Sequence, residues 1–576
     1  MDKKDIISIL NEIGTFLELK GENPFKCRAY HNAARVLDAT PEDIDDLIKT
    51  KKLGKLQGIG EALQEKITEL AEHGKLKYYD DLKKSIPSGL LEMIQLAGVG
   101  PKKAKHLYEE LGIKSIGELE YACQENRLLK IGGFGEKSQN NILKAIRFFR
   151  KSENRFLFPD AHAEAIRILD ILKKDKNVIE ASIAGSLRRR KEIVRDIDFV
   201  VATKNPAGVM KKFVSLPNVD RIISHGETKA STFLKAGIQA DIRCVTGKEY
   251  PFTLHHFTGS KEHNVALRSR AQTMGIKMNE YGLFKGKKLL PCKNEEEIFK
   301  RLGLDYIPPE LRENQGEIEA ASIHKLPHLI DWGDLCGTFH VHSLYSDGTA
   351  TIEAMASAAK KAGLQYVGIS DHSQSAFYAH GMKAADIKKQ HREIDELNKG
   401  FKNFRIFKGV ESDILADGSL DYDGKILDKF EFVIASVHSR FQMKEEEMTA
   451  RIIKALKNPH TTILGHMTGR LLLSREPYAV NIRKIIDTAV EHNKIIELNC
   501  NPYRCDIDWR HLQYAKKQGL KICINPDAHR IEGITDLELG IGLARKGGMG
   551  KKDVINTMSL KEMEKFLRFV AIDLNS

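Results

Sequence analysis

The chain has 576 residues, more than one ordinary hydrophobic core needs, and this length predicts roughly three to five structural units. Lys and Arg number 91 against 79 Asp and Glu, and the resulting net charge of +12 favours a polyanionic partner. No apolar run approaches the roughly 18 residues that span a bilayer, and the charged N-terminus lacks the apolar core of a signal peptide, so we expect a cytoplasmic protein with no membrane partner.

The first 150 residues predict short amphipathic helices separated by glycine-containing turns. Apolar residues recur at three- and four-residue spacing, beginning with Ile6, Leu10 and Ile13. Three turns share one pattern, in which two glycines flank an apolar residue just before a helix. The segments are Leu56–Gly60, Leu96–Gly100 and Ile131–Gly135.

Paired glycines of this kind let the backbone turn tightly and expose N–H groups at a helix N-terminus. That geometry binds a phosphate without reading the base sequence. A single copy could equally be an ordinary glycine-capped connection, but three copies followed by basic residues such as Lys102 and Lys103 favour phosphate binding. The turns resemble helix-hairpin-helix motifs. The resulting DNA-backbone contacts are predicted at Gly58, Gly60, Gly98, Gly100, Gly133 and Gly135.

Lys66 lies on the helix predicted after the first glycine pair. A lysine close to a bound phosphate can form a Schiff base with an abasic sugar. A solvated lysine on a basic helix face explains the spacing equally well. Both interpretations stay open at this point.

Residues 160–245 alternate between helix and strand patterns, with Ile183 predicted to open one strand and Asp196–Val201 to form another. The triplet Asp-Ile-Asp occurs at 43–45, 196–198 and 506–508, and its context separates the copies. The first copy stands at a predicted helix start, where acids serve as caps, and the third lies in a loop. The second leads directly into a strand, where positions i and i+2 share one face, so both carboxylates are expected to point to the same place.

Two further features accompany this carboxylate pair. Upstream, the Gly185-Ser186 turn can approach a triphosphate closely, and the arginines at 188–190 can neutralise it. Downstream, Asp241 offers a third acid on a predicted strand. Three carboxylates can hold two Mg²⁺ ions about 4 Å apart, between an attacking hydroxyl and a leaving pyrophosphate.

This constellation resembles the palm of the nucleotidyltransferase superfamily. The segment His256–Ser260 resembles the thumb entrance of family X DNA polymerases, and the N-terminal helices and glycine turns follow that family's order. The resemblance implies that Asp196 and Asp198 bind both metals. It also implies that Asp241 binds the catalytic metal and accepts the proton of, or orients, the primer 3′-hydroxyl.

The same resemblance assigns the nucleotide contacts. Ser186 and Arg189 would meet the β- and γ-phosphates beside Gly185, Phe257 and Gly259 would face the incoming sugar, and Asn264 would face the base edge. Lys66 falls where the family's deoxyribose-phosphate lyases carry their nucleophile. His256 stands where many members have a tyrosine, which leaves the strictness of sugar selection open.

From Gly337 onward, short apolar runs alternate with helical patterns, which predicts a parallel, barrel-like α/β domain. The runs are Tyr366–Ser370, Phe432–Ser436, Thr462–Leu464, Ile495–Leu498 and Ile522–Asn525. Histidines and acids follow nearly every predicted strand, and side chains at the carboxyl ends of barrel strands converge on one mouth. The predicted metal ligands are His340, His342, Asp347, His372, Glu411, His438, His466, Asp527 and His529.

This array resembles the PHP (polymerase and histidinol phosphatase) domain, whose order and spacing match residues 337–570. The resemblance implies a distorted (β/α)7 barrel that holds two or three Mn²⁺ or Zn²⁺ ions, whereas Mg²⁺ or Mn²⁺ would serve the palm. Metals bridged in this way generate a hydroxide that attacks a phosphodiester. Because all nine positions carry a suitable residue, we expect an active phosphoesterase.

The combined expectation is a multidomain protein with an α-helical helix-hairpin-helix N-terminal region, an α+β nucleotidyltransferase palm and thumb, and the C-terminal α/β PHP barrel. The predicted domains are a lyase-like helical domain at 1–85, fingers at 86–150, palm at 151–248, thumb at 249–315, linker at 316–336 and PHP domain at 337–576.

The two halves together resemble a bacterial or archaeal family X DNA polymerase with a C-terminal PHP domain. Such an enzyme fills short gaps in gapped or nicked duplex DNA with deoxynucleoside triphosphates, and its PHP domain removes 3′ nucleotides and can cut at abasic sites. We expect it to act as a monomer. Two alternatives remain: a phosphoesterase that acts on a small phosphate monoester and is tethered to DNA by a non-catalytic N-terminal half, and a non-catalytic DNA-binding scaffold.

Overall fold

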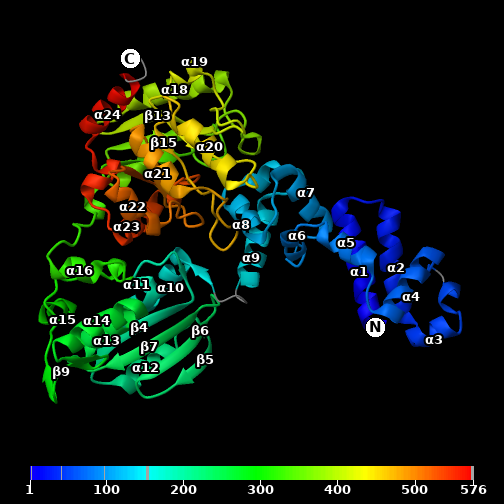
Figure 1. Cartoon of the computed structure of the whole chain (residues 1–576), viewed down its shortest axis with the longest axis horizontal. Helices are drawn as coiled ribbons and strands as arrows, with labels where there is room; N and C mark the ends of the chain where they lie inside the picture. The colour runs from blue at the N-terminus through cyan, green and yellow to red at the C-terminus, as the bar shows by residue number, and fades with distance from the viewer. Residues whose placement is uncertain (2, 41, 57, 97, 151–154, 573–576) are drawn as a thin grey trace. The chain divides into compact units, whose positions relative to one another are not determined.

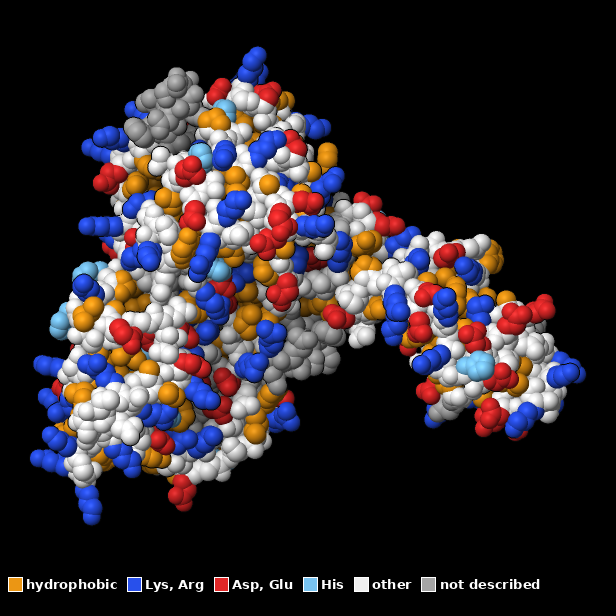
Figure 2. All heavy atoms as spheres, viewed as in Figure 1, with side chains coloured by type: hydrophobic (Ala, Val, Ile, Leu, Met, Phe, Trp, Pro, Cys, Tyr) orange, Lys and Arg blue, Asp and Glu red, His pale blue; other side chains and the backbone are white. Residues whose placement is uncertain are grey.

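The computed structural model in Figure 1 describes residues 1–576 except 2, 41, 57, 97, 151–154 and 573–576. The chain divides into two compact units, Met1–Phe149 and Arg150–Ser576, and each is described by itself. Within the described residues, no helix combines the length and the apolar character needed to cross a bilayer. On the face shown in Figure 2, Lys and Arg are interleaved with Asp and Glu and do not gather in one patch.

The first unit is helical, as predicted. Ile6, Leu10 and Ile13 are fully buried in its core, which confirms the amphipathic pattern of the first helix. The helices are α1 (Lys3–Lys20), α2 (Pro24–Ala39), α3 (Ile44–Lys49), α4 (Glu61–His73), α5 (Lys77–Lys84), α6 (Ser88–Met93), α7 (Pro101–Leu111), α8 (Ile116–Gln124) and α9 (Glu136–Arg150).

The second unit begins with the predicted palm, a five-stranded sheet of order β2-β4-β7-β6-β5 in which β4 and β7 run parallel and the other neighbouring strands run antiparallel. Its strands are β2 (Val178–Ile183), β4 (Asp196–Thr203), β5 (Val219–His225), β6 (Lys229–Leu234) and β7 (Gln239–Val245). Helices α10 (Phe158–Lys173) and α12 (Pro206–Val214) pack on the sheet, and β1 (Phe156–Leu157) pairs with β3 (Ile193–Val194).

The prediction that Ile183 opens a strand is wrong, because Ile183 is the last residue of β2. The strand starts at Val178 and ends where the backbone turns into the short helix α11 (Gly185–Arg188). Gly185 begins that turn with a φ of +62°, a conformation that favours glycine.

The thumb follows, with three helices and a three-stranded antiparallel sheet. These elements are α13 (Tyr250–Thr258), α14 (Lys261–Thr273), β8 (Lys277–Asn279), β9 (Gly282–Lys285), β10 (Lys288–Leu290) and α15 (Glu295–Arg301). The predicted linker contains a short α-helix, α16 (Glu317–Ser322), and a turn of 3-10 helix at Trp332–Asp334.

The C-terminal part is a seven-stranded, all-parallel sheet in the order of the sequence, β11 to β17. A bridge between Val341 and Ala528 joins the two ends of the sheet, so the barrel is nearly closed and the predicted (β/α)7 fold is confirmed. Its strands are β11 (Gly337–Val341), β12 (Tyr366–Ile369), β13 (Arg405–Asp413), β14 (Phe432–Ser436), β15 (Ile463–Leu464), β16 (Ile495–Asn499) and β17 (Ile522–Asn525). Its helices are α17 (Ile352–Lys361), α18 (Ala384–Gly400), α19 (Gly424–Leu427), α20 (Glu445–Leu456), α21 (Ile482–Glu491), α22 (Leu512–Lys517), α23 (Leu537–Lys546) and α24 (Leu560–Ile572).

The three Asp-Ile-Asp triplets take the contexts predicted for them. Asp43 accepts a hydrogen bond from the Ile44 amide and caps α3, and Asp196 begins β4. In the third copy, Asp506 accepts bonds from Thr468 at 2.9 Å, and Asp508 forms an ion pair with Arg470 at 2.5 Å. The first and third copies therefore have structural partners.

Candidate active sites

The palm brings its three acids together on two neighbouring strands. Asp198 of β4 lies directly beside Asp241 of β7 in the parallel register, and Asp196 stands two residues earlier on the same face. Neighbouring strands are about 4.8 Å apart, within reach of a shared ion for carboxylates on one face. Ile197 and Ala240, which immediately precede Asp198 and Asp241 on the two strands, are fully buried on the opposite face of the sheet.

The crowded negative charge changes how these acids titrate. Burial and the carboxylates of Asp196 and Asp241 raise the pKa of Asp198 to about 7. Burial and Asp241 likewise raise the pKa of Asp196. Carboxylates that repel one another in this way favour a bound cation, so the donor set fits the predicted Mg²⁺ or Mn²⁺ ions.

Two neighbours that the sequence analysis missed orient Asp241. The Ser231 hydroxyl on β6 donates to one carboxylate oxygen, and the Gln239 amide donates to the other at 2.9 Å. Gln239 stands two residues before Asp241 on the same strand face, a spacing that could have indicated the contact. Ser231 lies opposite Asp241 in the antiparallel register, which only the folded sheet reveals.

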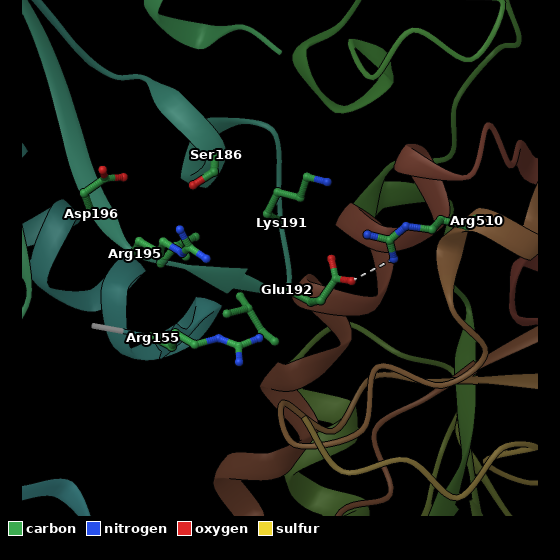
Figure 3. Close-up of a pocket in the computed structure, with 9 residues that line it drawn as sticks. Arg155, Ser186, Lys191, Glu192, Arg195, Asp196 and Arg510 are labelled. Carbon is green, nitrogen blue, oxygen red and sulfur yellow. Dashed lines mark hydrogen bonds and ion pairs between the residues drawn. The ribbon is translucent and has the colours of Figure 1, made fainter. Parts of the chain in front are cut away.

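The predicted triphosphate turn lies against the same acids. A Cβ at Gly185 would lie 2.1 Å from an oxygen of Asp198, so this position requires glycine. Ser186 and Asp196 line a cavity of about 400 Å³, and Figure 3 shows basic side chains from several segments around it. Those side chains are Arg155, Lys191, Arg195 and Arg510.

The remaining predicted nucleotide contacts lie at the junction of palm and thumb. Arg189 binds Glu313 at 3.0 Å and donates to the carbonyl of Thr258, beside Gly259. The Asn264 amide donates to the carbonyl of His256 at 2.7 Å. The guanidinium of Arg243, a residue of β7, lies over the Phe257 ring, 4.7 Å from the centroid of that ring. The structure thus gathers these residues where palm and thumb meet, with Arg189 already paired to a carboxylate.

The C-terminal barrel gathers all nine predicted ligands in one cluster. Ligand atoms of neighbouring residues lie within 4.8 Å of one another in four overlapping groups. The groups are His342, Asp347, His372 and His529; His340, His466 and Asp527; His340, His342 and Glu411; and His372, Glu411 and His438. Because the groups share members, they form one cluster that could hold more than one ion.

His340 reaches this cluster by a backbone irregularity. The residue has a φ of +58°, and the pairing of β11 with β12 shifts register between Thr338 and Val341. Left-handed φ in a non-glycine residue is uncommon and clusters at functional sites. The ring centroids of His340 and His342 lie 5.2 Å apart beside this irregularity.

The chemistry of the donors fits metal ions. Both ring nitrogens of the fully buried His342 lack a hydrogen-bond partner among the described residues. Burial and the imidazoles of His529 and His372 lower the pKa of His342 to about 3. A buried, neutral imidazole with unused nitrogens is the form of histidine that binds a metal.

A second layer of carboxylates orients the histidines. Glu497 lies 2.6 Å from Nδ1 of His340 and also accepts the backbone N–H of His466 at 2.8 Å. Asp413 lies 2.7 Å from Nδ1 of His438. Such contacts leave the other ring nitrogen for the metal. Neither acid was predicted from the sequence, although a charged residue inside the apolar run 495–498 was a signal for Glu497.

The three glycine turns of the first unit share one backbone geometry. Gly58, Gly98 and Gly133 have φ values of +99°, +89° and +88°. Gly60 and Gly100 are the N-caps of α4 and α7, and α9 starts directly after Gly135. A Cβ would meet nothing within 4 Å at five of the six glycines, so space for a ligand lies in front of them. Gln57 and Ala97 in the first two turns lie outside the described residues.

Lys66 projects from α4 in the same unit. Its ammonium donates to the carbonyl of Ala62 at 3.2 Å and lies 5.4 Å from the centroid of the Tyr78 ring. The side chain is partly exposed, so a substrate can reach it. These contacts fit a solvated lysine and a lyase nucleophile equally.

Comparison with family models supports the class of protein that these sites define. Residues 1–76 match a helix-hairpin-helix domain, and residues 90–147 match a SAM-like helix-hairpin-helix tandem. Residues 253–313 match the DNA polymerase beta thumb, and residues 338–501 match the PHP domain. The matched class is a polymerase scaffold joined to a PHP domain.

Similar proteins narrow the class. The chain is 41% identical over 575 residues to a Bacillus subtilis (strain 168) protein named DNA polymerase/3′-5′ exonuclease PolX, which covers 99% of this chain and 100% of that protein. It is 34% identical over 149 residues to the repair DNA polymerase X of an African swine fever virus isolate, covering 24% of this chain and 82% of the viral protein. A protein from Thermoanaerobacter sp. (strain X514) named as a probable phosphatase is 29% identical over 229 residues. The match covers 38% of this chain and 89% of that protein. The chain belongs to the family X DNA polymerases that carry a C-terminal PHP domain.

Proposed function

We propose that this chain is a DNA repair polymerase that fills short gaps in duplex DNA and degrades DNA from the 3′ end through its PHP domain. The observation that carries the polymerase is the register of Asp196, Asp198 and Asp241 beside the Gly185-Ser186 turn. The nine-ligand cluster carries the nuclease. The Bacillus subtilis relative, which matches this chain over almost its full length, is named for both activities.

In the palm, the three acids would hold Mg²⁺ or Mn²⁺, which supplies charge stabilisation for the transferred phosphate. The protein's own part is positioning. Ser231 and Gln239 donate to Asp241 and would hold it in place to accept the proton of, or orient, the primer 3′-hydroxyl. Ser186 and Arg189 would bind the triphosphate, Phe257 and Gly259 would pack on the sugar, and Asn264 would face the base. These roles are part of the proposal.

In the PHP domain, the nine ligands would hold two or three Mn²⁺ or Zn²⁺ ions, which supply a nucleophilic hydroxide. The mixed His and carboxylate set suits either metal. Glu497 and Asp413 fix the ring orientation of His340 and His438. The same site could cut beside an abasic sugar, and we include abasic-site endonuclease activity in the proposal.

The first unit would hold the DNA. The glycine turns present open backbone N–H groups at helix starts, which suits the phosphates of gapped or nicked duplex. We propose deoxynucleoside triphosphates as the second substrate and a monomer as the working form. Deoxyribose-phosphate lyase activity through Lys66 is a separate proposal, since the lysine is accessible near the first glycine turn.

A gapped-duplex assay with and without nucleotides tests the two activities together. Asp198→Ala should abolish extension and spare 3′ degradation, whereas His342→Ala should do the reverse, because the sites lie on different domains. Extension that survives Asp198→Ala refutes the polymerase. Degradation that survives His342→Ala refutes the nuclease. The lyase is tested by borohydride trapping on an abasic substrate, and an undiminished adduct with Lys66→Ala refutes it.

A second candidate function is a phosphatase acting on a small phosphate monoester, with the N-terminal half only binding DNA. The similarity to a protein named as a probable phosphatase favours it. Turnover of a small phosphate monoester, together with no action on gapped DNA, would select this alternative.

A further inference from the structure

The palm segment 189–192, which follows the predicted triphosphate turn, is held by the PHP domain. Lys546, the last residue of α23, donates to the carbonyl of Arg189 at 2.9 Å. The same ammonium lies 2.5 Å from Glu313, which in turn binds the Arg189 guanidinium at 3.0 Å. The Lys546 side chain is 0% exposed. One buried PHP lysine therefore fixes both the backbone and, through Glu313, the side chain of Arg189.

A second set of contacts from the PHP domain holds Glu192, at the end of the same segment. The Trp509 indole donates to Glu192 at 3.3 Å, and Arg510 donates to the other Glu192 oxygen at 3.2 Å. Figure 3 shows this Arg510–Glu192 contact at the edge of the cavity. The Lys191 ammonium lies 5.2 Å from the centroid of the Trp509 ring, so a cation–π contact adds to these hydrogen bonds.

The residue between these anchors fits closely against α23. A Cβ at Gly542 would lie 3.2 Å from the side-chain carbons of Arg190, so the glycine leaves room for that stem. The Arg190 guanidinium then reaches Glu538, one helical turn away, at 3.5 Å. All four residues of segment 189–192 thus contact the PHP domain.

The segment has a direct path to the polymerase site. It joins the Gly185-Ser186 turn to β3 and Asp196, and the cavity beside it is lined by Ser186, Asp196 and the PHP residue Arg510. A small displacement of a substrate-binding turn is costly, because transfer needs the reacting atoms in a narrow geometry. The position of the turn therefore depends on what holds its far end.

We propose that Lys546, Trp509 and Arg510 of the PHP domain are positioning residues for the nucleotide-binding turn of the polymerase. This inference rests on the proposed polymerase function. It makes the nuclease barrel a structural support of the palm, separate from its own chemistry. Loss of this support should weaken nucleotide binding and leave 3′ degradation intact.

Lys546→Met in the full-length, metal-loaded enzyme tests the inference. We expect the KM for the nucleotide in single-nucleotide gap filling to rise about tenfold or more, with a smaller change in kcat. The Kd of the same nucleotide on a dideoxy-terminated gapped duplex should rise by a similar factor. Degradation of a 3′ end, which reports that the barrel is folded, should stay within about twofold of wild type, and Lys546→Arg should restore part of the nucleotide affinity.

Arg545→Met is the matched control. Arg545 precedes Lys546 on α23, and its described hydrogen bonds go to Glu310 at 2.8 Å and to the carbonyl of Ile330 at 2.9 Å. It should leave the nucleotide Kd unchanged. An equal rise in the control would mean that general domain packing is responsible and would overturn the inference, as would an unchanged Kd in a folded Lys546→Met protein.

If Lys546→Met does not fold, Glu192→Gln decides the question. It keeps the side-chain volume and removes the charge that Arg510 meets, so a nucleotide Kd raised about threefold supports the inference and an unchanged Kd overturns it. Failure of the proposed function looks different. In that case the wild-type protein itself would not extend a primer.

Discussion

The palm and the PHP barrel both gather acids at strands, but the two sites balance charge in opposite ways. In the palm, burial and neighbouring carboxylates raise the pKa of Asp198 to about 7. In the barrel, burial would raise the pKa of Glu411, but the imidazoles of His372, His340 and His438 hold it well below its usual range. Histidines thus stabilise the charge of the central acid in the barrel, whereas the palm acids repel one another and depend more on bound cations.

The largest expected effect concerns the centre of the barrel cluster. Glu411 lies 2.8 Å from His372, 2.9 Å from His466 and 3.2 Å from His340. Glu411→Gln removes the negative charge that these three histidines share. We expect 3′ degradation to fall by about 10³-fold or more, with a loss of bound metal measured by elemental analysis.

The matched control for that experiment is Glu396→Gln, which changes an exposed acid paired with Lys399 on α18. It should leave both metal content and degradation unaltered. If Glu411→Gln retains its full metal content and its rate of 3′ degradation, the cluster is not the nuclease site. The comparison of the palm with the barrel as two metal sites would then fail.

A smaller effect is expected one layer further out. Glu497→Gln keeps the shape but removes the carboxylate that faces Nδ1 of His340. Second-layer changes of this kind cost about 10- to 100-fold in metal affinity. Competition with a chelator measures the change, and gap filling in the same preparation provides the control. Unaltered affinity would show that Glu497 does not orient His340.

The pH dependence of metal binding should differ between the regions. A proton competes with the cation for Asp198, so the apparent Mg²⁺ affinity of the palm should fall about tenfold per pH unit below pH 7 and level off above it. The folded-state pKa lies above that of the unfolded chain, so without metal this acid destabilises the protein increasingly as the pH rises from about 4 to about 7.

Calorimetric titration with Mg²⁺ between pH 5.5 and 8 measures this dependence, and Asp198→Asn should remove it. A wild-type affinity that does not vary over that range would contradict the raised pKa. It would also remove the proposed difference in charge balance.

The smallest effect concerns a single orienting hydrogen bond. Ser231→Ala removes the hydroxyl that donates to Asp241 and leaves the Gln239 donor in place. Loss of one such bond is worth about 1 kcal/mol, which corresponds to roughly a fivefold loss in kcat/KM for extension. Ser224→Ala on β5, the cross-strand partner of Ser231, is the control. Equal rates for wild type and Ser231→Ala would show that Gln239 alone holds the acid.

The sequence predicted most of the barrel because its signals are local. An apolar run followed by a histidine or an acid identifies a strand and the end that carries ligands, and β14 and β17 match their predicted runs residue for residue. Ile183 was predicted at the wrong end of its strand, because an apolar residue beside a glycine turn can be the first or the last residue of a strand. The left-handed backbone at His340 had no local signal, since a positive φ is uncommon in any non-glycine residue.

Contacts between distant segments were beyond the sequence pattern. The arginines after Ser186 were expected at the triphosphate, yet Arg188 forms a two-pronged ion pair with Glu295 of the thumb and Arg189 binds Glu313. A run of arginines does not say which member faces a ligand, because that depends on acids more than 100 positions away. Lys546 gave no signal at all, since a lysine at a helix end usually meets solvent.

The seam of the barrel also orders events during synthesis of the chain. Val341 and Ala528 join the first strand to the segment after the last, and the ligands His340 and His342 stand beside Asp527 and His529 across that seam. The three palm acids exist together once residue 241 has been made. The PHP cluster cannot form until residue 529 emerges from the ribosome, so it is the later of the two sites to assemble its ligands.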